Sequence, residues 1–460
     1  MIVMKFGGTS VGNAERLKKV ADIVINHPGE KPIVVLSAMA KVTEMLIEGT
    51  KAAERGDEET FYEIHEKLRE KHLGVIHDLK LGASLEREIK NLLEKILNLW
   101  EAIEALGEVT PRALDLISSM GERLIVRIFA DYLRSLQVPA RSFDADEFVV
   151  TTDTHGNACP IFSDSVELFN RKVMPWIKEG GLAVITGFMG KSRSGRVTTL
   201  GRGGSDLTAT FIGSLVNARE VWIWTDVDGV MTADPRVVPE ARSLKELSFV
   251  EVAELSYYGA KVMHPRSLLP VLEKNIPVRI RNTFNPGFPG TIISKQTKEQ
   301  KGIVKSITYI KDLTLLNVTG RGMLGIPGIA ARVFKTVSEK GANILMISQS
   351  SSEQNICFVV KKHEAQNLVD SLKKEFELEI YRRDIEGVEK LDDVAIISVV
   401  GAGMRGTPGI AGKVFTITGK NGINVIAIAQ GSSEFNISFV VEGKDAERAV
   451  VALHRELIES

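Results

Sequence analysis

The sequence predicts an α/β protein whose mostly parallel sheet lies between layers of helices, followed by two small ferredoxin-like βαββαβ units. Three observations lead to this prediction. Strand-like and helix-like stretches alternate over residues 1–290, which is typical of parallel strands with helical crossovers. About residues 43–136 are charged, with apolar residues at helical spacing, which indicates a helical insertion. The last part of the chain contains a repeated segment.

The predicted elements follow one another along the chain. The strand-like run IVMKF at 2–6 precedes the helix-like stretch AERLKKVADIVI at 14–25. The further strand-like runs are PIVVLSAM at 32–39, LAVITGF at 182–188, EVWIWTDV at 220–227 and IPVRIRN at 276–282. The polar segment SKQTKEQKG at 294–302 indicates a linker, so we expect the first domain to span residues 1–295.

Two copies of one segment follow this linker. GRGMLGIPGIAARVF begins at Gly320 and GAGMRGTPGIAGKVF begins at Gly401, and they align without a gap at an offset of 401 − 320 = 81 residues. In the second copy only GSSE separates the runs NVIAIAQ and FNISFVV, so these strands form an antiparallel hairpin. We expect units at 303–388 and 389–460, with a strand at 303–310 that can pair with the second unit.

Composition excludes several classes of function. Lysine plus arginine number 58 and aspartate plus glutamate 59, so no excess charge favours nucleic acid or an anionic membrane surface. The two cysteines, Cys159 and Cys357, lie far apart and in no metal-ligand spacing, which argues against a disulfide scaffold or a zinc site. The N-terminus shows no targeting segment and no apolar run reaches membrane length, so the expected location is cytoplasmic.

The stretch KFGGTS places a lysine at the end of the first strand. Gly7 and Gly8 allow the backbone to turn so that its N–H groups form an anion pocket, and Thr9 and Ser10 can add hydroxyl donors and cap the next helix. In a Walker loop the lysine would follow the glycines instead. The hexapeptide alone is equally compatible with a phosphate site and with a tight turn that exposes Lys5.

Two later stretches follow the same logic. TLGRGGSD at 199–206 precedes a helical run, and its Arg202 can fork onto a carboxylate or a phosphate. Asp206 can orient a cation such as Lys5 or lie near magnesium. TDVDGVMTADPR at 225–236 follows the apolar strand EVWIW, at the strand end where open α/β sheets bind ligands.

Together these segments resemble one family. KFGGTSVG, VVLSAMAKVT, MGER, TLGRGGSD, TDVDGV with DPR, and GAKVMHP occur in the order found in aspartokinases, the ATP:L-aspartate 4-phosphotransferases of the amino acid kinase family. The duplicated tail resembles the paired ACT domains that follow their catalytic domain. The resemblance spans nearly the whole chain. It implies the three-layer sandwich of amino acid kinases, the co-substrate ATP with Mg²⁺, and the first step of lysine, threonine, methionine and isoleucine biosynthesis.

The resemblance also implies roles for individual residues. Lys5 and Asp206 would be catalytic, with Lys5 neutralising the transferring phosphoryl group and Asp206 organising the basic groups around the phosphates. A general base is not required, because a carboxylic acid with a pKa near about 4 is already ionised at neutral pH. The implied aspartate-binding residues are Ser37, Thr43, Glu122, Arg202 and Ser205. The implied ATP-binding residues are Lys5, Gly7, Gly8, Thr9, Thr225, Asp226, Met231, Arg236 and Lys261.

At Met231 the family commonly has a tyrosine, so a flexible thioether replaces an aromatic nucleotide contact. The sequence does not show which side chains, if any, bind the Mg²⁺ directly.

Paired ACT domains in this family bind an end-product amino acid, and the tail implies such an allosteric site. We expect contacts from Asn343, Gln349, Asn424 and Gln430, which begin and end equivalent strands. A glutamine amide both donates and accepts, whereas lysine would call for an acidic partner. Glutamine at these places resembles threonine-responsive members of the family, so we favour threonine over lysine as effector. The glutamines could instead only pair edge backbone. ACT edges commonly pair across subunits, which implies a homodimer or homotetramer.

Two other functions remain open. The same fold could act on another acid, such as glutamate or N-acetylglutamate, although the ACT pair and MGER argue against it. The chain could instead be a catalytically silent amino-acid-binding regulator, but such a sensor needs none of Lys5, Arg202 and Asp206. The sequence stops directly after the second copy, so we expect no appended homoserine dehydrogenase.

Overall fold

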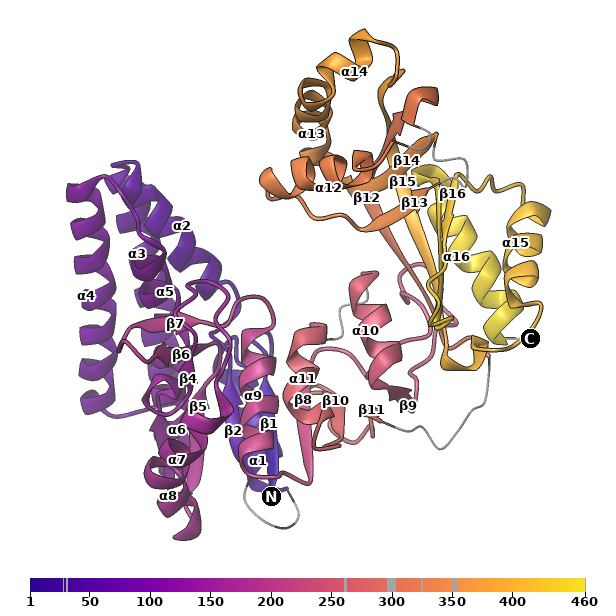
Figure 1. Ribbon diagram of the computed structural model, residues 1–460. Helices are drawn as coiled ribbons and strands as arrows, with labels where there is room; N and C mark the ends of the chain where they lie inside the picture. Colours follow the sequence, from indigo (N-terminus) through magenta and orange to yellow (C-terminus); the bar gives the residue numbers. More distant parts are fainter. Residues whose placement is uncertain are drawn as a thin grey trace. The chain divides into compact units, whose positions relative to one another are not determined.

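The computed structural model describes residues 1–27, 29, 32–259, 263–295, 303–323, 326–349 and 354–459 (Figure 1). Two compact units can be distinguished. The first comprises Met1–Val230, Lys245–Phe249 and Val262–Thr297, and the second comprises Met231–Leu244, Val250–Lys261 and Lys298–Ser460. Two short segments of the expected first domain therefore group with the C-terminal region. Within the described ranges, no helix combines the length and apolar character needed to cross a membrane.

The first unit is built on an eight-stranded sheet with the strand order β3-β5-β2-β1-β8-β10-β11-β9. Its strands are β1 (Ile2–Phe6), β2 (Ile33–Leu36), β3 (Ala140–Phe143), β5 (Leu182–Thr186), β8 (Glu220–Thr225), β9 (Glu246–Ser248), β10 (Val278–Asn282) and β11 (Thr291–Ser294). The neighbouring strands are parallel except β10 and β11. The loops that follow β1, β2, β5 and β8 therefore open at one edge of the sheet. A small second sheet contains β4 (Val150–Thr151), β6 (Met189–Ser192) and β7 (Val197–Thr199).

Helices cover both faces of the large sheet. The helices α1 (Ala14–Ile25) and α6 (Met120–Ser135) share a core with one face, and α9 (Gly204–Leu215) packs against β1, β2 and β8. Side chains alternate along β1, so Met4 and Phe6 enter the core under α1 while Lys5 faces the opposite side, that of α9. The same unit contains α7 (Phe162–Lys172), α8 (Met174–Lys178) and α11 (Leu269–Leu272).

Helices alone connect β2 to β3. They are α2 (Val42–Glu54), α3 (Glu58–Asp78), α4 (Ala83–Leu106), α5 (Pro111–Ser118) and α6. Trp100 of α4 is fully buried, and its indole N–H donates to the Thr50 hydroxyl of α2 at 3.1 Å. A Cβ at Gly49 would lie 2.3 Å from the Trp100 ring, so only glycine permits this close approach of α2 and α4.

The second unit contains a six-stranded sheet with the order β13-β14-β12-β15-β17-β16, drawn in orange to yellow in Figure 1. Its strands are β12 (Ser306–Thr319), β13 (Met346–Gln349), β14 (Asn355–Lys361), β15 (Gly387–Val400), β16 (Ala427–Ala429) and β17 (Asn436–Glu442). Its helices are α12 (Ile329–Glu339), α13 (Lys362–Glu375), α14 (Glu377–Tyr381), α15 (Ile410–Lys420), α16 (Ala446–His454) and most of α10 (Phe249–Tyr257).

The two repeats form one continuous sheet because β12 and β15 pair antiparallel along almost their whole length. Residues 306–310 of β12 pair with 396–400 of β15, beside β17, whereas residues 313–319 pair with β14. A break in register between Ile310 and Leu313 separates the two halves of β12. The first half of β12 thus belongs with the second repeat and the second half with the first repeat. The predicted α/β class is confirmed.

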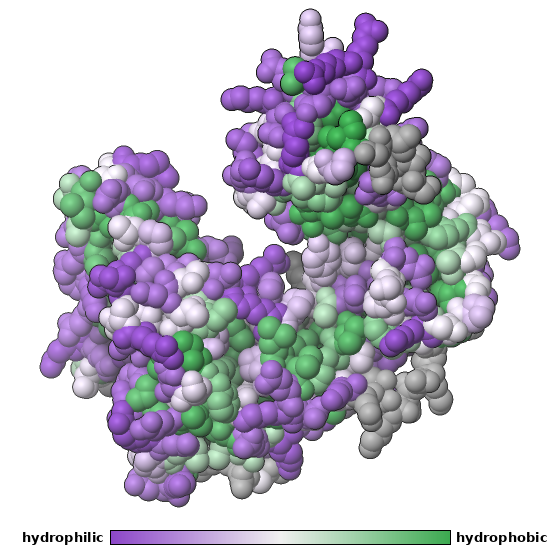
Figure 2. Space-filling view, viewed as in Figure 1, coloured by the Kyte–Doolittle hydropathy of each residue, from purple (hydrophilic) through white to green (hydrophobic). Residues whose placement is uncertain are grey.

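Helix α13 illustrates how this unit is layered. Leu368, Val369 and Leu372 are buried in the core of the first repeat, whereas the opposite side of the helix is charged. Figure 2 shows the outer surface of α13 and α14 in purple at the top of the view, with green apolar side chains of the same unit beneath.

Candidate active site

Lys5 and Asp206 form an ion pair in the first unit. The distance from Lys5 Nζ to Asp206 Oδ1 is 2.6 Å, and the two side chains are 11% and 14% exposed. Lys5 comes from β1, and Asp206 lies in the first turn of α9, where the helix dipole favours a carboxylate. The structure therefore brings together the two residues predicted to be catalytic, although they are about two hundred positions apart in the sequence.

The glycine turn after β1 is locked to its neighbours by backbone hydrogen bonds. The Gly7 N–H donates to the Trp224 carbonyl at 3.2 Å, and the Ala40 N–H donates to the Gly8 carbonyl at 3.1 Å. A Cβ at Gly8 would lie 2.7 Å from the carbonyl oxygen of Ala38. Gly8 is therefore needed so that the loops after β1 and β2 can meet.

The hydroxyl residues of KFGGTS do not cap α1, contrary to expectation. Asn13 caps this helix, because its side chain accepts from the Arg16 N–H at 3.0 Å and it lies directly before the first helical residue. Ser10 is buried and shares a hydrogen bond with Thr283 at 2.7 Å, and the Arg16 guanidinium donates to the Thr9 carbonyl at 2.6 Å. These contacts hold the turn while the Thr9 side chain stays exposed.

The turn before α9 projects an arginine. Gly201 and Gly203 have φ angles of +75° and +71°, a region that favours glycine, and Arg202 lies between them. Arg202 is exposed and makes no hydrogen bond or ion pair with the described residues. Ser205 lies so close to Gly187 after β5 that a Cβ on Gly187 would come within 2.6 Å of the serine side chain. An unpaired guanidinium at this edge is available to a carboxylate or phosphate.

Glu122 at the start of α6 is a buried carboxylate. Its Oε1 accepts from the Ala38 N–H at 3.1 Å, whereas its Oε2 has no hydrogen-bond partner among the described residues. Burial raises the pKa of Glu122 to about 8, although the Ala38 N–H and the Lys5 charge both act to lower it. A cationic group brought to Glu122 would favour its ionised form.

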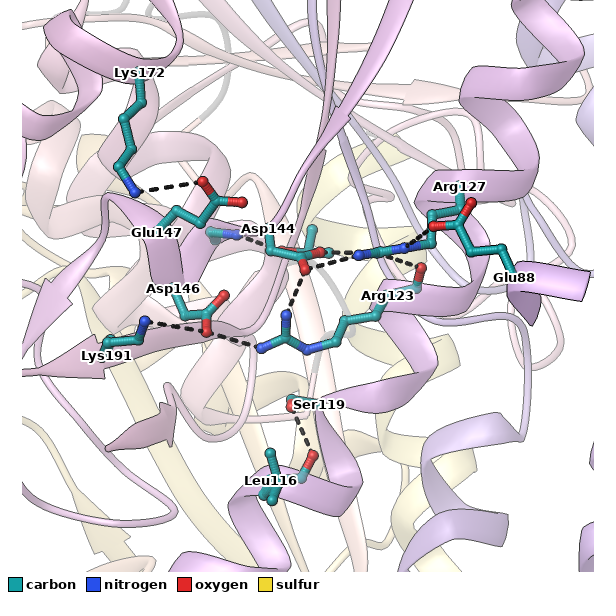
Figure 3. A network of polar contacts seen from close by, with 12 residues as sticks. Glu88, Leu116, Ser119, Arg123, Arg127, Asp144, Asp146, Glu147, Lys172 and Lys191 are labelled. Atoms are coloured by element: carbon teal, nitrogen blue, oxygen red, sulfur yellow. Dashed lines mark hydrogen bonds and ion pairs between the residues drawn. The ribbon is translucent and has the colours of Figure 1, made fainter. Parts of the chain in front are cut away.

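The residue after Glu122 anchors α6 to the loop after β3 (Figure 3). Arg123 pairs with Asp144 and with Asp146, the latter at 2.9 Å, and Arg127 pairs with Asp144 at 3.0 Å. Burial alone would raise the pKa of the Asp144 carboxyl, but the hydrogen bonds and charges of Arg127 and Arg123 outweigh it and lower that pKa. This network fixes the helix that carries Glu122.

The other predicted substrate and nucleotide residues fall into three groups. Ser37 follows β2 and Thr43 lies in the first turn of α2, and both are half-buried. Thr225 ends β8 and donates to Asp226 at 3.1 Å. Met231 and Arg236 belong to the second unit, where Arg236 is paired with Asp234 at 2.6 Å, and Lys261 lies outside the described residues.

Comparison with known proteins identifies the family. The model of the amino acid kinase family matches residues 1–282, and the model of the ACT domain matches residues 316–376 and 397–457. The chain belongs to the amino acid kinase family. The two matches together confirm the resemblance to aspartokinases and the predicted fold class, an α/β kinase domain followed by paired ACT domains.

Similar proteins are aspartokinases. The chain is 38% identical to Aspartokinase 2, chloroplastic, of Arabidopsis thaliana, over 100% of this chain and 84% of that protein. It is also 38% identical to Bifunctional aspartokinase/homoserine dehydrogenase 1, chloroplastic, of Zea mays, over 98% of this chain, but it spans only 50% of that relative's length. The chain thus covers about half of such bifunctional relatives.

Solved structures agree in fold. E. coli aspartokinase III in complex with aspartate and ADP, in the R-state, matches with a TM-score of 0.84 and 31% identity over 99% of both chains. The same enzyme in complex with lysine and aspartate, in the T-state, matches with a TM-score of 0.83 and 32% identity over 100% of this chain and 99% of that one.

In the ACT domains the predicted effector residues are all exposed. Gln349 ends β13 and lines a cavity of about 320 Å³ together with Met323, Pro327 and Ile356. In the second repeat the Gly406 N–H donates to the Glu434 carboxylate at 2.6 Å. Neither Gln349 nor Gln430 has a side-chain hydrogen bond to a described residue, so neither pairs edge backbone there.

Sequence reasoning missed a buried group beside the arginine turn. Asp115 is 2% exposed and contacts His155, Gly156 and Thr199. The only available signal was an acidic residue on the inner, apolar side of the helix RALDLIS, followed far along the chain by the turn-forming pair His155 and Gly156.

Proposed function

We propose that this chain transfers the γ-phosphoryl group of ATP to the β-carboxylate of L-aspartate, giving 4-phospho-L-aspartate and ADP. The observation that carries this proposal is the Lys5–Asp206 ion pair beneath the glycine turn, with Arg202 in the turn before α9 and Glu122 in the first turn of α6. The similarity to aspartokinases, including one in complex with aspartate and ADP, supports the same assignment. The product would open the route to lysine, threonine, methionine and isoleucine.

Lys5 is assigned to the transferring phosphoryl group. Its ammonium neutralises negative charge on the phosphoryl oxygens as a β-carboxylate oxygen forms a bond to phosphorus and the bond to the ADP oxygen breaks. Asp206 holds the Lys5 side chain in place through their 2.6 Å contact. The N–H groups of Gly8 and Thr9 add fixed donors on the phosphate side, whereas the Gly7 N–H, expected to join them, is already bonded to the Trp224 carbonyl.

Charge complementarity orients the aspartate. The Arg202 guanidinium binds the α-carboxylate in a forked contact, and Glu122 receives the α-ammonium. Ser37, Thr43 and Ser205 supply hydroxyl groups at the same edge of the sheet. The β-carboxylate, ionised at neutral pH, then needs no base before it attacks.

Thr225 and Asp226, with Met231, Arg236 and Lys261, are assigned to the nucleotide on the basis of the family motif. Among the described residues no group of three or more His, Cys, Asp and Glu side chains could hold a metal ion. Mg²⁺ would enter with the phosphates of ATP, as is usual for this cation.

The ACT pair is assigned to feedback by an end-product amino acid. We favour the first repeat as the effector-binding site, because Gln349 lines an open cavity there. In the second repeat the Gly406 N–H is already hydrogen-bonded to the Glu434 carboxylate. Asn343 is assigned to the same effector site in the first repeat. Asn424 and Gln430 are the equivalents of Asn343 and Gln349 in the second repeat. Threonine stays our favoured effector because an amide suits a hydroxyl group, and the lysine complex of a similar enzyme makes lysine the competing candidate.

Effector binding would shift the enzyme toward a form with weaker substrate binding. We also assign the chain to the cytoplasm and to a homodimer or homotetramer formed through its ACT domains. Kinetics with aspartate and ATP, measured with and without threonine or lysine, tests the effector. Identical kinetics under all conditions would dismiss feedback by either amino acid.

A hydroxamate assay tests the reaction itself, because hydroxylamine traps an acyl phosphate. The enzyme, ATP and Mg²⁺ would be offered L-aspartate, L-glutamate or N-acetyl-L-glutamate in parallel. We expect hydroxamate from L-aspartate only. Product from either glutamate compound would indicate a kinase of another acid, and no product with any acid, despite binding of an amino acid, would indicate a silent regulator.

A further inference from the structure

Asp115 in α5 is a buried carboxylate to which the proposed reaction gives no role. Its side chain is 3% exposed. Its oxygens accept hydrogen bonds from His155 Nδ1 at 2.7 Å, from the Gly156 N–H at 3.0 Å and from the Thr199 hydroxyl at 2.5 Å. Because a buried carboxylate is costly unless its oxygens are paired, these donors and Asp115 hold one another in place.

The donors belong to a short closed loop at residues 152–159 and to the end of β7. The Thr152 N–H donates to the Cys159 carbonyl at 2.9 Å, and the Cys159 N–H donates to the Thr152 hydroxyl at 3.0 Å. The Ala158 N–H donates to the Thr199 carbonyl at 2.9 Å, and the Arg266 guanidinium donates to the Ala158 carbonyl at 2.6 Å. The loop is thus fixed at its base and on two sides.

The turn that carries Arg202 rests on this loop. A Cβ at Gly201 would lie only 2.8 Å from the Gly156 carbonyl oxygen, so the two backbones touch. On the other side of the turn, the Ser267 hydroxyl donates to the Gly203 carbonyl at 3.1 Å. The Arg202 guanidinium has no hydrogen bond of its own to the described residues. The position of the Gly201–Gly203 turn therefore determines the direction of the Arg202 side chain.

We propose that Asp115 is a positioning residue for Arg202, the arginine assigned to the substrate carboxylate. Asp115 holds His155 and Gly156, Gly156 supports Gly201, and the Gly201–Gly203 turn presents Arg202. Without the Asp115 carboxylate, the Gly156 N–H and the Thr199 hydroxyl lose their acceptor and the support of the turn loosens. The inference rests on the proposed function, and it predicts an effect on the binding of aspartate rather than on ATP.

Steady-state kinetics of Asp115→Asn tests this proposal. We expect KM for aspartate to rise about tenfold or more, while KM for ATP and kcat stay within about threefold of the parent values. A role in stability alone would lower the fraction of active enzyme, and hence kcat, without raising KM for aspartate. That second pattern would overturn the proposal.

Glu220→Gln is the matched control. Glu220 is a half-buried carboxylate with several donors, since it accepts from Trp222 Nε1 at 2.6 Å and from Arg279 Nε at 3.0 Å. It lies at the start of β8, at the sheet edge opposite the arginine turn. We expect KM for aspartate to be unchanged in this variant. A rise equal to that of Asp115→Asn would contradict a specific role for Asp115.

Variants of His155 test the same link if Asp115→Asn does not fold. His155→Asn keeps an N–H donor close to the position of Nδ1, whereas His155→Leu removes it. We expect near-parent KM for aspartate in the first and a raised KM in the second. Equal KM values in the two variants would contradict the proposal.

A double-mutant cycle with Arg202→Ala shows whether the effect passes through the arginine. We expect Asp115→Asn to add little to the rise in KM for aspartate that Arg202→Ala causes by itself. Independent, multiplying effects would show that Asp115 acts elsewhere. Failure of the proposed function is a separate result, because the parent enzyme would then form no aspartyl hydroxamate at all.

Discussion

Replacement of Glu122 by glutamine should stabilise the protein at alkaline pH while impairing its use of aspartate. Burial raises the pKa of Glu122 to about 8, well above the ordinary value of 4.5. A folded-state pKa above the unfolded value means that the native state holds the proton more tightly. The stability associated with the neutral carboxyl is therefore complete below about pH 4.5 and is lost as the pH rises through about 8.

The size of the effect follows from these two pKa values. A difference between 4.5 and about 8 corresponds to roughly 5 kcal/mol in the free energy of unfolding once the pH is above both values. At pH 5 less than roughly 1 kcal/mol of this cost has appeared. Glutamine is neutral throughout, so the advantage of Glu122→Gln should grow by roughly 4 kcal/mol between pH 5 and pH 9, or about 7 °C in melting temperature.

Thermal denaturation of parent and Glu122→Gln at pH 5, 7 and 9 measures this difference. Glu220→Gln is a control in which the pKa shift has the opposite sign. Burial would raise the pKa of Glu220, but hydrogen bonds from Arg279 and Trp222 and the Arg279 charge lower that pKa overall. Its stabilising effect is present above its usual pKa and is lost in acid, so this variant should be less stable than the parent at neutral pH. A difference in melting temperature between parent and Glu122→Gln that does not change with pH would show that the pKa of Glu122 is not raised in the folded protein.

Three further predictions follow from the site. KM of the parent enzyme for aspartate should fall severalfold between about pH 6.5 and 8.5, as Glu122 ionises, whereas Glu122→Gln should have a raised KM that does not change with pH in this range. The same pH dependence of KM in both enzymes would contradict the assignment of Glu122 to the substrate. Gly8→Ala should lower turnover at least about tenfold, because its Cβ would meet a backbone oxygen at 2.7 Å, whereas Gly82→Ala, in open space, should behave as the parent. Gln349→Ala should weaken feedback by the effector about tenfold or more, and Gln430→Ala should change it less; inhibition curves that shift equally would remove the preference for the first repeat.

The loops at the sheet edge could be predicted from the sequence, because parallel strands end on one side and local glycines mark the turns. Alternation of side chains along IVMKF also determines the face of the sheet on which Lys5 lies, since Met4 and Phe6 must enter the core. The environment of Glu122 could not be predicted, because burial of a helix charge depends on the loop after β2 that packs on it. The same applies to Asp115, whose partner Thr199 is 84 positions away.

The boundary between the two units also depends on long-range contacts. Helix α10 lies within the sequence of the kinase region, yet Glu251 of this helix is fully buried against the second unit. It approaches Lys305 to 3.6 Å and accepts from the Ala402 N–H at 2.8 Å. Likewise, the pairing of residues 306–310 with 396–400 requires a register between β12 and β15 that local patterns do not encode.

The most direct test of the catalytic assignment is the turnover of Lys5→Met, measured beside its affinity for aspartate. Methionine keeps the length and apolar character of the lysine stem but removes the charge that faces Asp206. We expect kcat for aspartyl phosphate formation to fall about a thousandfold or more, while the Kd of aspartate, measured by calorimetry, changes less than about threefold. Retention of more than about a tenth of the parent turnover would contradict the assignment of Lys5 to the transferring phosphoryl group.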